Sequence, residues 1–177
     1  MNVIETAIDG VLILEPKKFG DSRGFFVESY QKERYQNIGI QQEFVQDNHS
    51  RSSYGILRGL HFQKKKPQGK LVRVTQGRVL DVAADINPES NTFGQHVAVE
   101  LNEENCRQFW VPPGFAHGFV VLSEIADFMY KCTDYYDPSD EGGVIWNDPQ
   151  IGIDWQIKTP TLSPKDLQLP TLSALFS

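Results

Sequence analysis

The strongest constraint on the fold is a series of short apolar and β-branched segments that recur from residue 11 to residue 133. The residues between them, such as FGD, SSYG, NPES and PPG, are rich in Gly, Pro, Asn, Asp and Ser, which favour chain reversal. The predicted strands cover residues 11–15, 25–29, 43–46, 56–63, 70–76, 78–86, 96–101, 108–111, 117–122 and 127–133. Many short strands at this spacing are typical of an antiparallel sandwich or barrel.

Within several segments the side chains alternate with a period of two, as a strand with two different faces requires. In residues 70–76, Val72 and Val74 share one face and Leu71 and Arg73 share the other. Helical patterns are weak. Residues 29–40 predict a short helix closed by Gly39, and the stretch after residue 160 predicts a turn or two. We therefore expect an all-β protein with a few short peripheral helices.

Length and charge limit the organisation and the partners. The 177 residues fit a single domain, residues 1–177. A formal net charge of -6 argues against nucleic acid and anionic membranes as partners, although a few local Arg and Lys residues can still bind a phosphate. The sequence has neither an apolar run of membrane-spanning length nor an export signal, which predicts a cytoplasmic protein. Cys106 and Cys132 have no metal-binding spacing, and we interpret both as buried thiols.

Histidines scattered through a β-protein raise the hypothesis of a metal site. The four histidines are at positions 49, 61, 96 and 117. Metal-binding cupins usually have two histidines one residue apart on a strand, but here His61 is followed by Phe62 and Gln63, and then by three lysines that would repel a cation. The other cupin-like element, VPPGFAHGF around His117, supports the fold more than the metal. We predict no metal.

His61 lies in the segment LRGLHFQ, three residues after Arg58. Strict alternation would place these two side chains on opposite faces of the strand, so we expect a bulge at Gly59 if both serve one site. A single histidine is more often a packing or surface residue than a catalyst, and no other titratable residue is specific by itself.

Several long segments taken in order resemble the dTDP-4-dehydrorhamnose 3,5-epimerase family. They are DSRGFFVESY (21–30), FVQDNHSRSSYGILRGLHFQ (44–63), QGKLVRVTQGRVLDVAADI (68–86), TFGQHVAVEL (92–101), FWVPPGFAHGFVVLSE (109–124), YKCTDYY (130–136), EGGVIWNDPQIGIDW (141–155) and LSPKD (162–166). The resemblance extends over nearly the whole chain.

This resemblance implies a cupin-like jelly roll, a homodimer and an isomerase without a cofactor. The implied reaction inverts carbons 3 and 5 of dTDP-4-dehydro-6-deoxy-D-glucose to give dTDP-4-dehydro-L-rhamnose. No cofactor is needed because the ketone at carbon 4 acidifies the hydrogens on both neighbouring carbons, so that a base, an oxyanion stabiliser and an acid suffice.

The resemblance also assigns roles to residues of this chain. His61 matches the general base, and Asp166 matches its partner, which orients the imidazole. Lys70 matches the cation beside the ketone oxygen, and Tyr130 matches the acid that returns a proton to the opposite face. The matched substrate-binding positions are Arg23, Glu28, Gln46, Asp47, Asn48, Arg58, His117, Tyr136, Glu141 and Lys165. Tyr136 would stack on thymine, and Arg23 and Glu28 would act across the dimer.

Two alternatives remain open from sequence. A related enzyme that inverts a single carbon or isomerises the ketone would use similar residues, because the sequence does not reveal the shape of the pocket. A non-catalytic sugar-binding jelly roll would need the nucleotide contacts but not the base and the acid.

Overall fold

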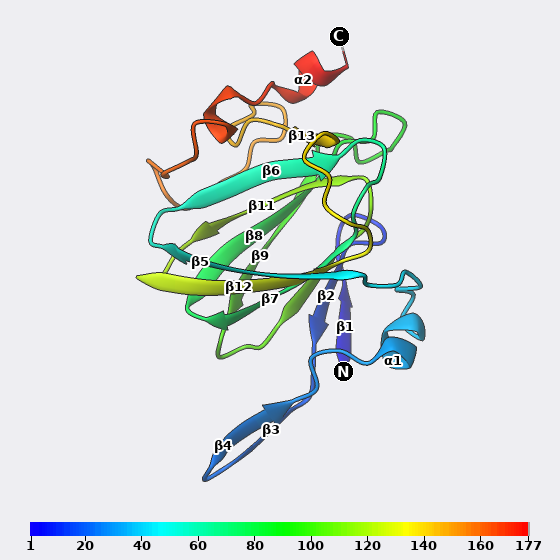
Figure 1. The fold of residues 1–177 in the computed structure, drawn as a ribbon, viewed down its shortest axis with the longest axis vertical. Helices are drawn as coiled ribbons and strands as arrows, with labels where there is room; N and C mark the ends of the chain where they lie inside the picture. Colours follow the sequence, from blue (N-terminus) through cyan, green and yellow to red (C-terminus); the bar gives the residue numbers. More distant parts are fainter. Residues whose placement is uncertain (177) are drawn as a thin grey trace.

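The computed structural model describes residues 1–176, which form two antiparallel sheets lying face to face and a projecting hairpin (Figure 1). The larger sheet has the spatial order β1 (Asn2–Glu5), β2 (Leu12–Glu15), β10 (Gln108–Val111), β7 (Lys70–Gln76), β12 (Ile125–Cys132) and β5 (Gln46–Ser53). The smaller sheet has the order β13 (Glu141–Gly143), β6 (Leu57–Gln63), β11 (Phe115–Val121), β8 (Arg78–Asp85) and β9 (His96–Asn102). The hairpin consists of β3 (Lys18–Asp21) and β4 (Gly24–Val27). The predicted all-β class is confirmed.

Short helices lie at the periphery, as predicted. The helix α1 (Lys32–Gln36) is followed by Gly39, whose φ of +98° reverses the chain where the sequence predicted the end of the helix. After residue 160 the chain forms the 3-10 turn η1 (Asp166–Gln168) and the helix α2 (Leu172–Leu175).

Strand β5 is the main departure from the predicted elements. The prediction placed a strand at residues 43–46, but only Gln46 belongs to one, and the strand continues through polar residues to Ser53. Apolar periodicity could not identify it, because β5 lies at the edge of the larger sheet with polar side chains on both of its faces. The short strands β1, β3 and β13 were also not predicted.

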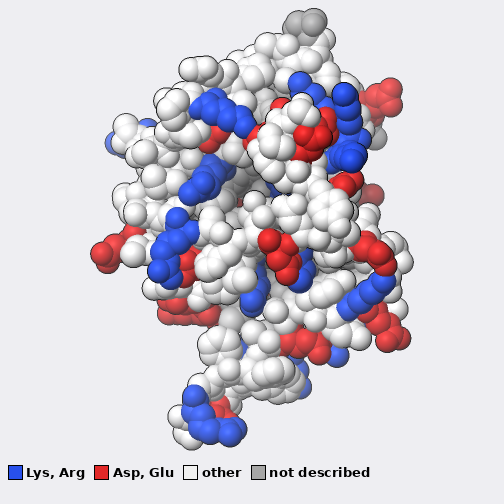
Figure 2. Space-filling model, in the orientation of Figure 1, with Lys and Arg blue, Asp and Glu red and all other residues white. Residues whose placement is uncertain are grey.

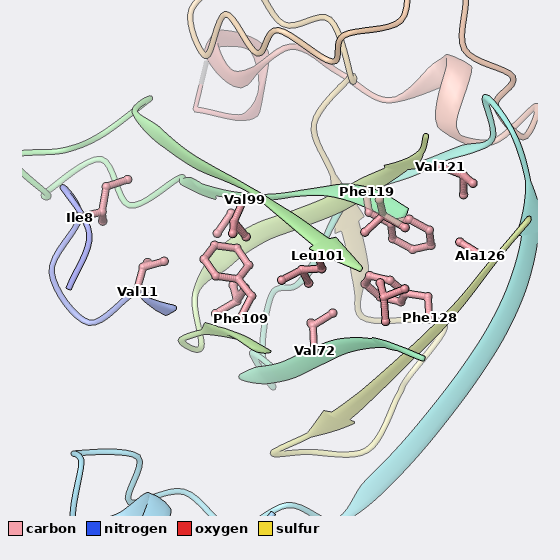
Figure 3. Packing of buried hydrophobic residues seen from close by; sticks show 14 residues of the cluster. Ile8, Val11, Val72, Val99, Leu101, Phe109, Phe119, Val121, Ala126 and Phe128 are labelled. Carbon is pink, nitrogen blue, oxygen red and sulfur yellow. The ribbon is translucent and has the colours of Figure 1, made fainter. Parts of the chain in front are cut away.

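The main hydrophobic core fills the space between the two sheets (Figure 3). Val72 and Val74 of β7 pack there, as their alternation predicted. Phe119 of β11 and Phe128 of β12 stack across the sheets with ring centroids 3.8 Å apart. This contact ties the sheets together next to the polar part of the interior.

The outer faces of both sheets are covered as well. The segment that follows β13 packs on the outside of the smaller sheet, where Trp155 and Leu172 are buried. On the larger sheet, Leu71 is buried against Tyr35 of α1 and Trp110. The outward face of β7 is therefore partly apolar.

One cysteine differs from its predicted environment. Cys132 is buried in β12 as expected, but Cys106 is only half-buried. It lies in the turn between β9 and β10, where its thiol donates to the carbonyl of Glu103 at 3.3 Å.

The β3–β4 hairpin extends away from the sheets, and Lys and Arg side chains gather at its free end (Figures 1 and 2). Its aromatic side chains Phe19, Phe25 and Phe26 are 52%, 57% and 67% exposed. Exposed aromatic residues on a protruding hairpin indicate a contact surface rather than a self-contained element. Within residues 1–176, no helix is long and apolar enough to cross a membrane.

Candidate active site

A cavity of about 610 Å³ opens between the two sheets where β5, β6 and β12 come together. Strands of both sheets contribute its walls, and the segment from Thr161 to Asp166 closes one side. Its lining includes these predicted site residues: Gln46, Asn48, Arg58, His61, Lys70, His117, Tyr130, Tyr136, Glu141, Lys165 and Asp166. Residues far apart in the sequence thus meet in one polar site.

The predicted bulge in β6 is present. His61 pairs with His117 of β11, whereas Arg58 pairs with Phe119, so β6 uses one residue more than β11 over this stretch. Gly59 has a φ of +129°, and a Cβ atom there would lie 2.6 Å from the Cα atom of Gly118. Only glycine fits this close backbone approach. As a result, Arg58 and His61 both reach the cavity.

His61 and Asp166 form a close pair. Nε2 of His61 lies 2.7 Å from Oδ1 of Asp166, and the side chains are 28% and 6% exposed. Burial raises the pKa of the Asp166 carboxyl, but the hydrogen bond and charge of His61 and the hydrogen bonds from Ser163 and Gly59 outweigh it, so the pKa lies below its ordinary value. Because a carboxylate only accepts hydrogen bonds, Nε2 carries the hydrogen and Nδ1 is left to accept a proton.

Tyr130 and Lys70 reach the cavity from the opposite sheet. Tyr130 lies on β12 and Lys70 on β7, and both strands belong to the larger sheet, whereas His61 belongs to the smaller one. Burial raises the pKa of Tyr130 to about 12, so its phenol is protonated at neutral pH. Dense protein surroundings lower the pKa of Lys70. The neighbouring side chains of Cys132, Asp81 and Glu141 act in the opposite direction and raise the pKa of Lys70.

A linked group of polar side chains lies at the rim. The hydroxyl of Tyr136 donates to Glu141 at 2.7 Å, and the ammonium of Lys165 pairs with the same carboxylate oxygen. The hydrogen bond to Glu141 and burial raise the pKa of Tyr136 to about 12. The backbone N–H of Tyr136 donates to Gln46, which in turn donates to Asn48 at 3.1 Å. This network fixes the aromatic ring beside the entrance.

Two side chains that hold residues of the cavity in place were not predicted from the sequence. Gln63, which stands where a metal-binding cupin would have its second histidine, donates to the carbonyl of Tyr135 and accepts from the N–H of Asp137, and so holds the loop that carries Tyr136. Asp81 does not line the cavity itself, but it accepts a hydrogen bond at 2.7 Å from His117, which does. The charge of Asp81 within the apolar run RVLDVAA was the pattern that could have identified it.

Three predicted residues do not line this cavity. Arg23 pairs with Asp21 at the free end of the hairpin, and Glu28 lies just after its second strand. Asp47 pairs with Lys131 on the face of β5 that points away from the cavity. The geometry of one chain therefore does not bring these three to the site.

Comparisons with known proteins agree with this geometry. The family model described as dTDP-4-dehydrorhamnose 3,5-epimerase matches residues 5–174. The chain belongs to the dTDP-4-dehydrorhamnose 3,5-epimerase family. It is 59% identical over 175 residues to the epimerase of that name from Salmonella typhimurium, with 97% of this chain and 96% of the relative covered. It is 56% identical to the one from Escherichia coli, with 99% and 97% covered.

The fold of this chain is also similar to solved structures of the family. A crystal structure of a dTDP-6-deoxy-D-glucose-3,5-epimerase from Legionella pneumophila, in complex with dTDP-4-keto-L-rhamnose, is 56% identical and superposes with a TM-score of 0.95. The alignment covers 97% of this chain and 93% of that one. Membership of the 3,5-epimerase family confirms the predicted cupin-like jelly roll and the isomerase class.

Proposed function

We propose that this member of the 3,5-epimerase family converts dTDP-4-dehydro-6-deoxy-D-glucose into dTDP-4-dehydro-L-rhamnose in the cavity described above, in dTDP-L-rhamnose biosynthesis. The observation that carries the proposal is the placement of the His61–Asp166 pair on one wall and of Tyr130 on the opposite sheet. A sugar ring held between them would meet a base on one face and an acid on the other. Inversion of a carbon requires that arrangement.

In the proposed mechanism His61 removes the proton from a carbon next to the ketone. Asp166 holds the imidazole ring and stabilises the imidazolium that forms. Lys70 faces the ketone oxygen and stabilises the enolate, which is the charge that develops in the transition state. Tyr130 then donates its phenolic proton to the other face. Since its pKa is about 12, the site must stabilise the phenolate that is left behind.

The rim network would bind the nucleotide. Tyr136 offers an exposed ring for stacking on thymine, and its bonds to Glu141 and Gln46 hold that ring in place. Arg58, anchored on Ser52 by hydrogen bonds of 3.1 and 3.2 Å, offers a guanidinium suited to a phosphate oxygen. Asn48, His117 and Lys165 complete the polar lining.

We further propose a homodimer in which the β3–β4 hairpin reaches the partner's cavity. Support comes from its exposed aromatic residues and from the distance of Arg23 and Glu28 from the cavity of their own chain. Mixing Arg23→Ala chains with His61→Ala chains tests this. In mixed dimers one site would regain both residues, so activity should return; an inactive mixture that has exchanged subunits would contradict it.

We also propose that residues 1–177 act as one domain in the cytoplasm.

Solvent exchange tests the reaction. Incubation with dTDP-4-dehydro-6-deoxy-D-glucose in deuterium oxide should place deuterium at carbons 3 and 5 of the product. Label at one carbon would support a single-carbon epimerase, and no label would overturn the enzyme assignment. His61→Ala should abolish exchange at both carbons, whereas a fully active variant would refute its role as base.

A further inference from the structure

Asp81 is a charged residue within the hydrophobic core. It lies in β8 between Val79 and Ala83, the neighbours that face the same way, and all three have no solvent exposure. In the sheet it pairs with Phe119 and Val99, which are also core residues. A position of this kind normally holds an apolar side chain, because burying a carboxylate is costly unless it has partners.

Only one of the two oxygens of the Asp81 carboxylate has a hydrogen-bond partner. Oδ1 accepts from Nε2 of His117 at 2.7 Å, whereas Oδ2 is the one buried side-chain oxygen or nitrogen in residues 1–176 that has no hydrogen bond. Asp81 does not line the cavity, but His117 does. A buried carboxylate that has one free oxygen, and whose hydrogen-bond partner lines a polar cavity, indicates an electrostatic role towards that cavity.

The group that needs this charge is Lys70. Lys70 lies on the same face of β7 as Val72 and Val74, so it points into the space between the sheets that Asp81 also faces, and it lines the cavity. Within residues 1–176 its ammonium makes no ion pair or hydrogen bond. Burial lowers the pKa of Lys70, and the groups that oppose this shift are Cys132 of β12, Asp81 of β8 and Glu141 of β13. The Cys132 thiol is itself buried with a raised pKa, and Glu141 is already paired at the rim. Asp81 is thus the carboxylate without another cation to neutralise.

The groups that shift the pKa of His117 support the same link between Asp81 and Lys70. Burial lowers the pKa of His117, the charge and hydrogen bond of Asp81 oppose this, and Lys70 and His61 lower it further. A neutral His117 donates one hydrogen to Asp81 and leaves the negative charge of the carboxylate uncancelled. That charge then remains available to Lys70.

We propose that Asp81 is a positioning residue that keeps Lys70 protonated and fixes the orientation of the His117 ring. The inference rests on the proposed function, in which a cationic Lys70 stabilises the enolate. Asp81 itself would not touch the substrate. Its contribution would be a fixed negative charge next to His117, without which the ammonium would lose its proton at a lower pH.

The pH dependence of catalysis separates this role from a structural one. Asp81→Asn keeps the shape and removes the charge, so the alkaline limb of the kcat profile should move to lower pH by about one unit, with a loss of about tenfold above that limb. KM should change little. Asp85→Asn is the matched control, because Asp85 is also buried in β8 but bonds to Ser90 and Thr92 away from the cavity. An unmoved limb in folded Asp81→Asn would overturn the proposal.

Labelling of Lys70 gives a measurement that does not depend on activity. Neutral amines react with trinitrobenzenesulfonate, so mass spectrometry of the labelled peptide across pH reports the protonation of Lys70. In the unmodified protein we expect Lys70 to resist labelling at neutral pH, and in Asp81→Asn we expect the midpoint of labelling to move to lower pH. A Lys70 that is already reactive at pH 7 in the unmodified protein would overturn the proposal, even if the variant does not fold. Absence of solvent exchange with normal labelling would instead refute the proposed function alone.

Discussion

Replacing Asp166 by asparagine tests how much the His61–Asp166 pair contributes to proton abstraction. The variant keeps the size of the side chain but removes the charge that stabilises the imidazolium. A hydrogen bond to a charged group contributes about 1.5–3 kcal/mol where solvent is largely excluded. His61 is 28% and Asp166 only 6% exposed, so this range applies. If that contribution is made mainly in the transition state, kcat should fall about 10- to 150-fold.

The assay is initial-rate deuterium incorporation into the sugar in deuterium oxide, with kcat and KM separated. KM should stay within about threefold, because the carboxylate stabilises a charge that forms only during reaction. Asp127→Asn is the matched control: Asp127 also bonds a histidine, His49, at 3.1 Å, but outside the cavity. Unchanged kcat in Asp166→Asn, or an equal loss in Asp127→Asn, would refute this role.

Three further predictions follow from the same structure. Tyr130→Phe should slow formation of product more than loss of the substrate proton, measured as tritium release from labelled substrate; equal losses would contradict its role as the acid. Gly59→Ala should lower the free energy of unfolding by about 2 kcal/mol or more in urea titrations, since its Cβ would meet the backbone of Gly118 at 2.6 Å. Asp127 should stabilise the fold above about pH 3.8, because its hydrogen bond from Arg51 lowers its pKa to about 2. The difference in unfolding free energy between the unmodified protein and Asp127→Asn should therefore shrink as the pH falls from 3.8 to about 2, and a constant difference would contradict this.

Local patterns in the sequence predicted most of the sandwich because apolar side chains line the space between the sheets. Val72 and Val74 alternate with residues on the other face, and this period is visible without any structure. The same reasoning failed for β5, where Gln46, Asn48 and Ser50 face the cavity and the alternate residues are also polar. A strand that serves the site has no apolar face to reveal it.

The candidate site was only partly accessible from the sequence. The bulge at Gly59 could be predicted, since Arg58 and His61 could not otherwise share a site. The link between Asp81 and His117 could not, because the two residues belong to different strands and meet only through the pairing of β8 with β11. Tertiary pairing of that kind leaves no trace in local periodicity.

The histidines show why composition alone could not identify the base. Three of them pair with an aspartate in almost the same way, with distances between the paired atoms of 3.1 Å for His49, 2.7 Å for His61 and 2.7 Å for His117. Their side chains are 53%, 28% and 6% exposed. His49 does not line the cavity, and its ring is about half exposed to water. His117 is so buried that its lowered pKa disfavours the imidazolium that a base must form. Of the three, only His61 both lines the cavity and keeps an intermediate exposure of 28%, so the difference that matters for catalysis is the environment of the pair and not the pair itself.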